Sequence, residues 1–286
     1  DRLKGLEVGE QVIVEAANGK PMGLAYVNPN SLICARIVSR DPSMRLDRSL
    51  LVHRLNQALA LRQSLFDKPF YRLVHGEADL LPGLVIDRYA EVLVVQLNTA
   101  GMEAVKDELL DALDKVLSPA CVVLRNDTSG RRQEGLSEVV EVVKGELPEQ
   151  VLLEENGVQF AAPVLDGQKT GWFYDHRINR AWLNQRVAGK RVLDLFSYIG
   201  GWGVQAAAHG ASEVLCVDAS ESALDRVAEN AALNGQHERV AVGHGDAFEA
   251  LAALKADGEK FDVIVLDPPA FIKRRKDIAN GERAYA

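Results

Sequence analysis

The sequence RVLDLFSYIGGWG, residues 191–203, restricts the possible folds more strongly than any other part of the chain. A short apolar run ends in an acid, a glycine-rich turn follows, and helix-forming alanines lead to a second apolar run, EVLCVD, residues 213–218. This order of strand, tight turn, helix and strand is typical of a nucleotide-binding α/β sheet with parallel strands. Gly200, Gly201 and Gly203 permit the close approach of a ligand because they carry no Cβ.

The acid at position 194 indicates which ligand this turn prefers. The dinucleotide fingerprint G-x-G-x-x-G receives a pyrophosphate, and the carboxylate of Asp194 would repel such a group. The ammonium of a methionine-derived sulfonium cofactor would pair with it instead, so the pattern favours S-adenosylmethionine (SAM). Asp218 stands roughly 20 residues beyond the turn, where a doubly wound fold places an acid on the ribose hydroxyls. A similar sheet that binds nothing at this turn is the alternative.

A second motif, FDVIVLDPPAF, covers residues 261–271. Its apolar part predicts a buried parallel strand that ends at Asp267, and ligands bind beyond the carboxyl ends of such strands. The two prolines that follow fix φ, so the loop can hold a polar group rigidly against a planar base. Asp246 follows the preceding apolar run and is placed to accept a hydrogen bond from an adenine amino group. An ordinary turn at a strand end is the alternative for Asp-Pro-Pro.

These motifs, together with residues 71–88 and 167–180, carry a specific resemblance. Residues 190–271 look like a class I SAM-dependent methyltransferase, and the whole chain resembles the ribosomal RNA large-subunit methyltransferase I family. The resemblance implies an N-terminal PUA domain, SAM as cofactor and cytosine carbon 5 of large-subunit ribosomal RNA as the target. Two departures matter. His176 stands where the family usually has glutamine, and the nucleophilic cysteine of the family would lie beyond residue 286, so we expect a partial stretch of a longer protein.

The motifs and the resemblance assign the candidate site residues. Asp267 is the expected catalytic residue, placed to hydrogen-bond the target base. The resemblance makes the segment around Phe173 and Arg177 a wall of the cofactor pocket, where the ring would stack on a base or adenine and the guanidinium would hold the cofactor carboxylate; an interdomain hinge is the alternative. The expected cofactor-binding residues are Asp194, Ser197, Tyr198, Gly200, Gly201, Asp218, Asp246, Ala247, Phe173 and Arg177. The expected RNA-binding residues are Lys273, Arg274, Arg275 and Lys276.

The chain is expected to form three domains within the α/β class. They are a PUA-like RNA-binding β-barrel with an incomplete N-terminus (residues 1–46), an α+β middle domain (47–165) and a SAM-dependent methyltransferase domain with a Rossmann-like sheet (166–286), the C-terminal part of which is missing. Asn18-Gly19 and Glu155-Asn-Gly157 predict hairpin turns, and Asp47 predicts the cap of a helix that runs to about Phe66. The middle segment predicts two strands, a helix over residues 102–117, and two further strands.

The composition excludes several functional classes. A net charge of −8 argues against a generally basic nucleic-acid binder, so RNA binding must come from local patches such as residues 273–276. The chain has no apolar run long enough to span a membrane. Cys34, Cys121 and Cys216 are scattered, which argues against disulfides and a metal site. We expect a cytoplasmic protein that binds ribosomal RNA and not a membrane, with a homodimer as a candidate assembly.

Several functions compete with cytosine methylation. Guanine-N7 methylation of ribosomal RNA is the nearest, since a related family has a similar Asp-Pro-Pro-x-Phe loop. Amino-group methylation usually requires an aromatic residue directly after the second proline, whereas this chain has Ala270 there. A non-catalytic RNA-binding ribosome assembly factor and an NAD-dependent oxidoreductase complete the alternatives.

Overall fold

The computed structural model describes residues 3–272 and 275–285, without the side chains of Lys276 and Asn280. The chain divides into two compact units. Unit 1 comprises Asp1–Leu153 and Ala162–Tyr174, and unit 2 comprises Glu154–Ala161 and Asp175–Ala286. Residues 1–46 and 47–165, expected as separate domains, therefore both belong mainly to unit 1, and the segment 166–174 joins them there.

Unit 1 begins with a small antiparallel sheet in the region expected to be a β-barrel. Its strand order is β1-β2-β3, formed by β1 (Gln11–Glu15), β2 (Pro21–Val27) and β3 (Ala35–Ser39). The predicted turn between the first two strands is confirmed, since Gly19 has a φ of +80° and the flanking strands pair antiparallel.

The rest of unit 1 is a five-stranded mixed sheet with helices. The predicted cap of the first helix, α1 (Arg48–Leu65), is confirmed because Asp47 Oδ1 accepts a hydrogen bond from Leu50 N at 3.0 Å. The helix expected over residues 102–117 is instead two helices, because Val105 leaves helical geometry at φ −110°, ψ 24°. The sheet order is β4-β5-β6-β7-β8, in which only β6 and β7 pair parallel. The elements are β4 (Phe70–His75), η1 (Gly76–Asp79), β5 (Leu84–Tyr89), β6 (Val92–Leu97), α2 (Ala100–Ala104), α3 (Lys106–Leu117), β7 (Cys121–Asn126), α4 (Ser129–Gln133) and β8 (Val139–Lys144).

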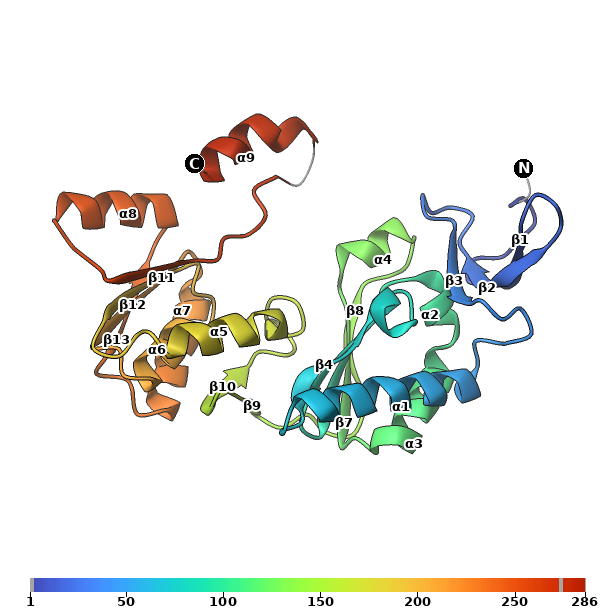
Figure 1. Ribbon diagram of the computed structural model, residues 1–286, viewed down its shortest axis with the longest axis horizontal. Helices are drawn as coiled ribbons and strands as arrows, with labels where there is room; N and C mark the ends of the chain where they lie inside the picture. Colours follow the sequence, from blue (N-terminus) through green and yellow to red (C-terminus); the bar gives the residue numbers. More distant parts are fainter. Residues whose placement is uncertain (1–2, 273–274, 286) are drawn as a thin grey trace. The chain divides into compact units, whose positions relative to one another are not determined.

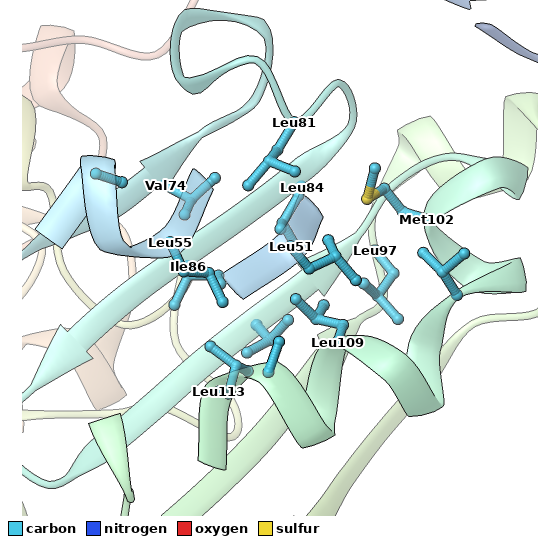
Figure 2. Close-up of a cluster of buried hydrophobic side chains, with 14 of the residues drawn as sticks. Leu51, Leu55, Val74, Leu81, Leu84, Ile86, Leu97, Met102, Leu109 and Leu113 are labelled. Atoms are coloured by element: carbon cyan, nitrogen blue, oxygen red, sulfur yellow. The ribbon is translucent and has the colours of Figure 1, made fainter. Parts of the chain in front are cut away.

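The core of unit 1 lies between this sheet and its helices. Leu51 and Leu55, one turn apart on α1, are fully buried, and Figure 2 shows them beside Leu84 and Ile86 of β5 and Leu113 of α3. Residues four apart lie on one face of a helix, so a single apolar stripe of α1 closes this core.

Unit 2 contains the parallel sheet that the motifs predicted. The strands β11 (Arg191–Leu195), β12 (Glu213–Asp218), β13 (Val240–His244) and β14 (Val263–Leu266) pair parallel in the order β13-β12-β11-β14. The chain thus adds β12 and β13 on one side of β11 and then crosses to place β14 on the other side. This is a doubly wound arrangement with its switch point between β11 and β14, and it confirms the predicted fold class.

Helices cover both faces of this sheet. Leu193, Leu195 and Val217 pack with Ala247 of α8 (Ala247–Ala256), whereas the alternate residues Asp194 and Cys216 face α6 (Gly203–Ala208). Figure 1 shows α8 on the opposite side of the sheet from α6 and α7 (Glu221–Leu233). Successive residues of a strand point to opposite faces, so Asp194 is directed into the α6 layer. The other elements are η2 (Tyr174–His176), α5 (Arg177–Asn184), η3 (Arg275–Asp277) and α9 (Ile278–Tyr285).

A two-stranded hairpin, β9 (Val151–Glu155) and β10 (Val158–Ala162), contains two of the three boundaries between the units. Its turn has positive φ at Asn156 (54°) and Gly157 (80°), which confirms the predicted Asn-Gly hairpin. Among the helices that the structure describes, none is both long and apolar enough to cross a lipid bilayer.

Candidate active site

The loop after β11 adopts an unusual backbone conformation. Phe196, Tyr198 and Gly200 have φ values of +61°, +50° and +83°. The left-handed region costs non-glycine residues about 1–3 kcal/mol each and is concentrated at functional sites. At Gly200 a Cβ would also lie 2.8 Å from Val204 Cγ2, so this position requires glycine for both backbone and packing reasons. The loop is therefore a candidate ligand cradle on local geometry alone.

Asp194, the acid at the end of β11, is fully buried. Its Oδ2 accepts a hydrogen bond from Gly203 N at 2.9 Å at the start of α6. Burial raises the pKa of Asp194 to about 7. The hydrogen bond from Gly203 and the charge of Arg180 lower this pKa, whereas the charges of Asp267 and Asp218 raise it further. A buried carboxyl of this kind ionises readily only when a cation lies beside it.

Two buried oxygens at this turn have no hydrogen-bond partner among the described residues. They are Asp194 Oδ1 and Ser197 Oγ. Buried polar atoms are nearly always paired in native proteins, so both are candidate ligand contacts. Their chemistry suits an ammonium group, which brings positive charge and N–H donors. The site residues present therefore fit a SAM-type cofactor with an amino-acid tail, which Asp194 and Ser197 would hold.

Asp218, at the end of β12, connects the two strand-end loops. Its Oδ2 accepts from Tyr198 N and its Oδ1 from Ser220 N, both at 2.9 Å. A carboxylate oxygen has a second lone pair, so these bonds are compatible with the predicted contact to ribose hydroxyls. Asp218 also fixes the strained Tyr198 backbone.

Asp246 lies two residues after β13 and caps α8. Its Oδ1 accepts from Phe248 N at 2.8 Å and from Glu249 N at 3.3 Å. Ala247 is buried, and the Phe248 ring lies 6.0 Å from the Phe271 ring. The predicted adenine contact of Asp246 remains a prediction, and any such contact would use a carboxylate that already caps a helix.

Asp267 follows β14 on the other side of the switch point, about one third exposed. Its Oδ2 receives two contacts: Trp202 Nε1 donates to it at 3.2 Å, and His176 Nε2 lies 3.3 Å away. The His176 and Trp202 rings are 5.6 Å apart. Sequence reasoning did not identify Trp202, although an indole between the glycines of a ligand-binding turn is a signal that could have pointed to it.

A buried charged cluster lies behind this group, around Glu155 of the β9–β10 hairpin. Glu155 is 1% exposed and contacts Arg180 Nη1 at 2.8 Å and Arg177 Nε at 3.4 Å. Gln205 Nε2 of α6 donates to the same carboxylate at 3.0 Å. Arg177 thus pairs with a protein carboxylate, and its expected contact with the cofactor carboxylate remains a prediction. Sequence reasoning missed Glu155 and Arg180, whose partners are distant in the chain.

For the remaining predicted residues, the structure shows the position but no contact that bears on the expected role, or does not describe the residue. Gly201 is buried in the turn after β11. Phe173 belongs to unit 1, where Lys169 Nζ lies 4.0 Å above its ring. Of the basic run, Lys273, Arg274 and the Lys276 side chain lie outside the described residues, and Arg275 is exposed. Their expected roles stay predictions.

The parallel sheet and its strand-end acids are those expected of the SAM-dependent methyltransferases with a doubly wound sheet. A family model described as S-adenosylmethionine-dependent methyltransferase matches residues 72–283, and a PUA-like domain model matches residues 1–40. These matches confirm the expected enzyme class, the cofactor SAM and the PUA-like N-terminal region.

Comparison with curated proteins narrows the class to a family. The chain is 38% identical to Ribosomal RNA large subunit methyltransferase I of Aliivibrio fischeri over 291 aligned residues, which cover 100% of this chain and 74% of that protein. The protein of the same name from Vibrio cholerae is 37% identical over 98% of this chain and 72% of its own length. The chain belongs to the ribosomal RNA large subunit methyltransferase I family.

Solved structures share the fold. SMU.776, whose crystal structure was solved in complex with S-adenosylhomocysteine (SAH), matches with a TM-score of 0.82 and 23% identity, over 96% of this chain and 72% of that one. A SAM-dependent methyltransferase candidate from Streptococcus mutans matches with a TM-score of 0.82 and 22% identity, over 99% and 76%.

Proposed function

We propose that this methyltransferase transfers a methyl group to carbon 5 of a cytosine in large-subunit ribosomal RNA. The proposal is carried by 37–38% identity, over 98–100% of the chain, to relatives named Ribosomal RNA large subunit methyltransferase I. The PUA-like match at residues 1–40 supports it further, as does the resemblance to cytosine-carbon-5 enzymes noted above.

The residues of unit 2 have separate tasks in this proposal. SAM supplies an electrophilic methyl group on a sulfonium centre. Asp194 and Ser197 bind its ammonium end and Asp218 its ribose. Asp267 hydrogen-bonds the target base, which must be unstacked or flipped out to reach a residue at a strand end. The hydrogen bond and the ion pair of Asp267 within the described residues both end on Oδ2, so Oδ1 is suited to accept from the base.

Carbon 5 of cytosine is a weak nucleophile, and enzymes activate it by adding a thiolate to carbon 6. Two thiols of this chain are poorly suited to that step. Cys121 and Cys216 are buried, and burial raises the pKa of both, that of Cys216 well above its usual range. Cys34 is half-buried in unit 1, just before β3. The proposal therefore requires a thiol other than Cys121 and Cys216, and we assign none among the described residues.

Mass-spectrometric mapping of ribosomal RNA nucleosides from cells with and without the gene tests this function. The expected result is the loss of one 5-methylcytidine from large-subunit RNA, restored by the wild-type gene. Loss of 7-methylguanosine instead would replace the proposal with the guanine-N7 alternative. An unchanged nucleoside pattern would contradict both.

The proposal also places the protein in the cytoplasm, where ribosomal RNA would be its partner. Nothing in the site bears on the expected homodimer. Light scattering of the purified protein, which measures its molar mass in solution, tests that expectation.

A further inference from the structure

We infer that His176 and Trp202 are positioning residues that fix the orientation of the Asp267 carboxylate. The inference rests on the proposed contact between Asp267 and the target base. It assigns a role to the imidazole at the position where the family usually has glutamine, and to an indole within the glycine-rich turn.

The backbone around Asp267 cannot orient its carboxylate in the usual way. Two other acids after strands of this sheet accept a hydrogen bond from the N–H two residues further on: Asp218 accepts from Ser220 N and Asp246 from Phe248 N. The corresponding residue after Asp267 is Pro269, and Pro268 precedes it. Proline has no backbone N–H, so this local bond is chemically impossible at Asp267.

Side chains from two other elements contact the carboxylate instead, one by a hydrogen bond from Trp202 and one by the imidazole of His176. Trp202 Nε1 and His176 Nε2 converge on the same oxygen, Oδ2, at 3.2 and 3.3 Å. The indole hydrogen bond and the imidazole contact meet on one oxygen and together restrict the rotation of the carboxylate. The other oxygen, Oδ1, is then presented in one direction.

The indole of Trp202 is packed against a further charged side chain. The guanidinium of Arg180 lies 5.5 Å from the centre of the Trp202 ring, and Arg180 in turn contacts the buried Glu155 at 2.8 Å. His176 immediately precedes α5, the helix that carries Arg180. A continuous series of contacts within unit 2 therefore runs from Glu155 at the end of β9 through Arg180 and Trp202 to Asp267.

The indole N–H of Trp202 reports on this arrangement without any substrate. The chain has three tryptophans, so an amide–indole NMR spectrum of the deuterated protein should show three indole signals, and Trp202→Phe assigns one of them. Asp267→Asn and His176→Ala should move the Trp202 signal and speed its hydrogen exchange. The exposed controls Asp257→Asn and His237→Gln should not. A signal that stays in place in Asp267→Asn and His176→Ala would overturn the inference.

Methyl transfer to RNA and SAH binding provide the second readout. His176→Ala and Trp202→Phe should each lower kcat about tenfold, the effect of one lost hydrogen bond to a charged group, with SAH affinity within twofold of wild type. His176→Gln keeps an N–H donor and should recover most of the rate.

The readouts separate this inference from the proposed function. If the indole signal responds as expected but no cytosine is methylated, the positioning role stands and the substrate assignment fails. If His176→Ala and Trp202→Phe weaken SAH binding as much as they slow methyl transfer, the two residues serve the cofactor and the positioning role is refuted.

Discussion

Cys216 lies beside Asp194 inside the sheet of unit 2, with Sγ 3.9 Å from Oδ2. Both side chains are fully buried, and the pKa of each is raised, mainly by burial. The β11–β12 register pairs the two residues directly, so they face α6 together. The acid that we propose to bind the cofactor ammonium thus has an uncharged thiol, and no cation, for its neighbour on β12.

The raised pKa of Asp194 predicts that the free protein loses stability as pH rises. The folded-state pKa of about 7 lies above the ordinary 3.8. Protonated Asp194 therefore makes its full contribution to the free energy of unfolding below about pH 4. This contribution is lost as pH rises through 7, because the folded state then holds a buried charge. The free energy of unfolding lost in this way is at most about 4 kcal/mol. The free energy of unfolding of wild type should fall relative to Asp194→Asn between pH 5 and 8; a constant difference would refute the burial effect.

The same carboxyl predicts that SAH binding releases a proton. Pairing with the ligand ammonium requires ionised Asp194, so below pH 7 the dissociation constant should rise by up to about tenfold per pH unit. Calorimetry at pH 6.5 in buffers of different ionisation enthalpy measures the proton release. Asp194→Asn should bind more weakly and release no proton at this group. Binding that is equally tight at pH 6 and 8 would be incompatible with the assigned role.

Gly203→Ala should destabilise the protein and displace Asp194. A Cβ there would lie 2.3 Å from Cys216 Sγ and 3.1 Å from Asp194 Oδ2, both buried. Overpacking a filled core costs about 1–3 kcal/mol. Gly130→Ala is the matched control, a glycine in α4 with no atom closer than 3.7 Å to the added Cβ. In urea unfolding, Gly203→Ala should have a lower midpoint than Gly130→Ala. Equal midpoints would show that the turn accommodates the added Cβ without loss of stability.

Asp267→Ala should abolish methyl transfer and leave cofactor affinity nearly intact. The substitution removes the group proposed to contact the base, while Asp194 and Asp218 stay on β11 and β12 and Ser197 in the loop after β11. Single-turnover methylation and SAH calorimetry on one preparation measure both quantities. Unchanged turnover would remove Asp267 from the mechanism.

Local patterns in the sequence were sufficient for much of the fold. Apolar runs that end in acids predicted β11, β12 and β14, and Asn-Gly pairs predicted two hairpin turns. Asp47 predicted the start of α1. These signals succeed because a capping bond, a positive φ or alternating burial depends on residues within a few positions of one another. The helix expected over residues 102–117 failed at Val105, where no glycine or proline marks the break.

The sequence by itself determined a SAM-binding parallel sheet and placed Asp194, Asp218 and Asp267 at the ends of its strands. Only the tertiary structure decided what surrounds those acids: Cys216 beside Asp194, His176 and Trp202 on Asp267, and Glu155 beneath Arg180. The physical reason is that these contacts join side chains from separate elements. The distances between these side chains depend on strand order and helix placement. Both are decided by the burial of apolar residues across the whole unit, and no local sequence pattern specifies them.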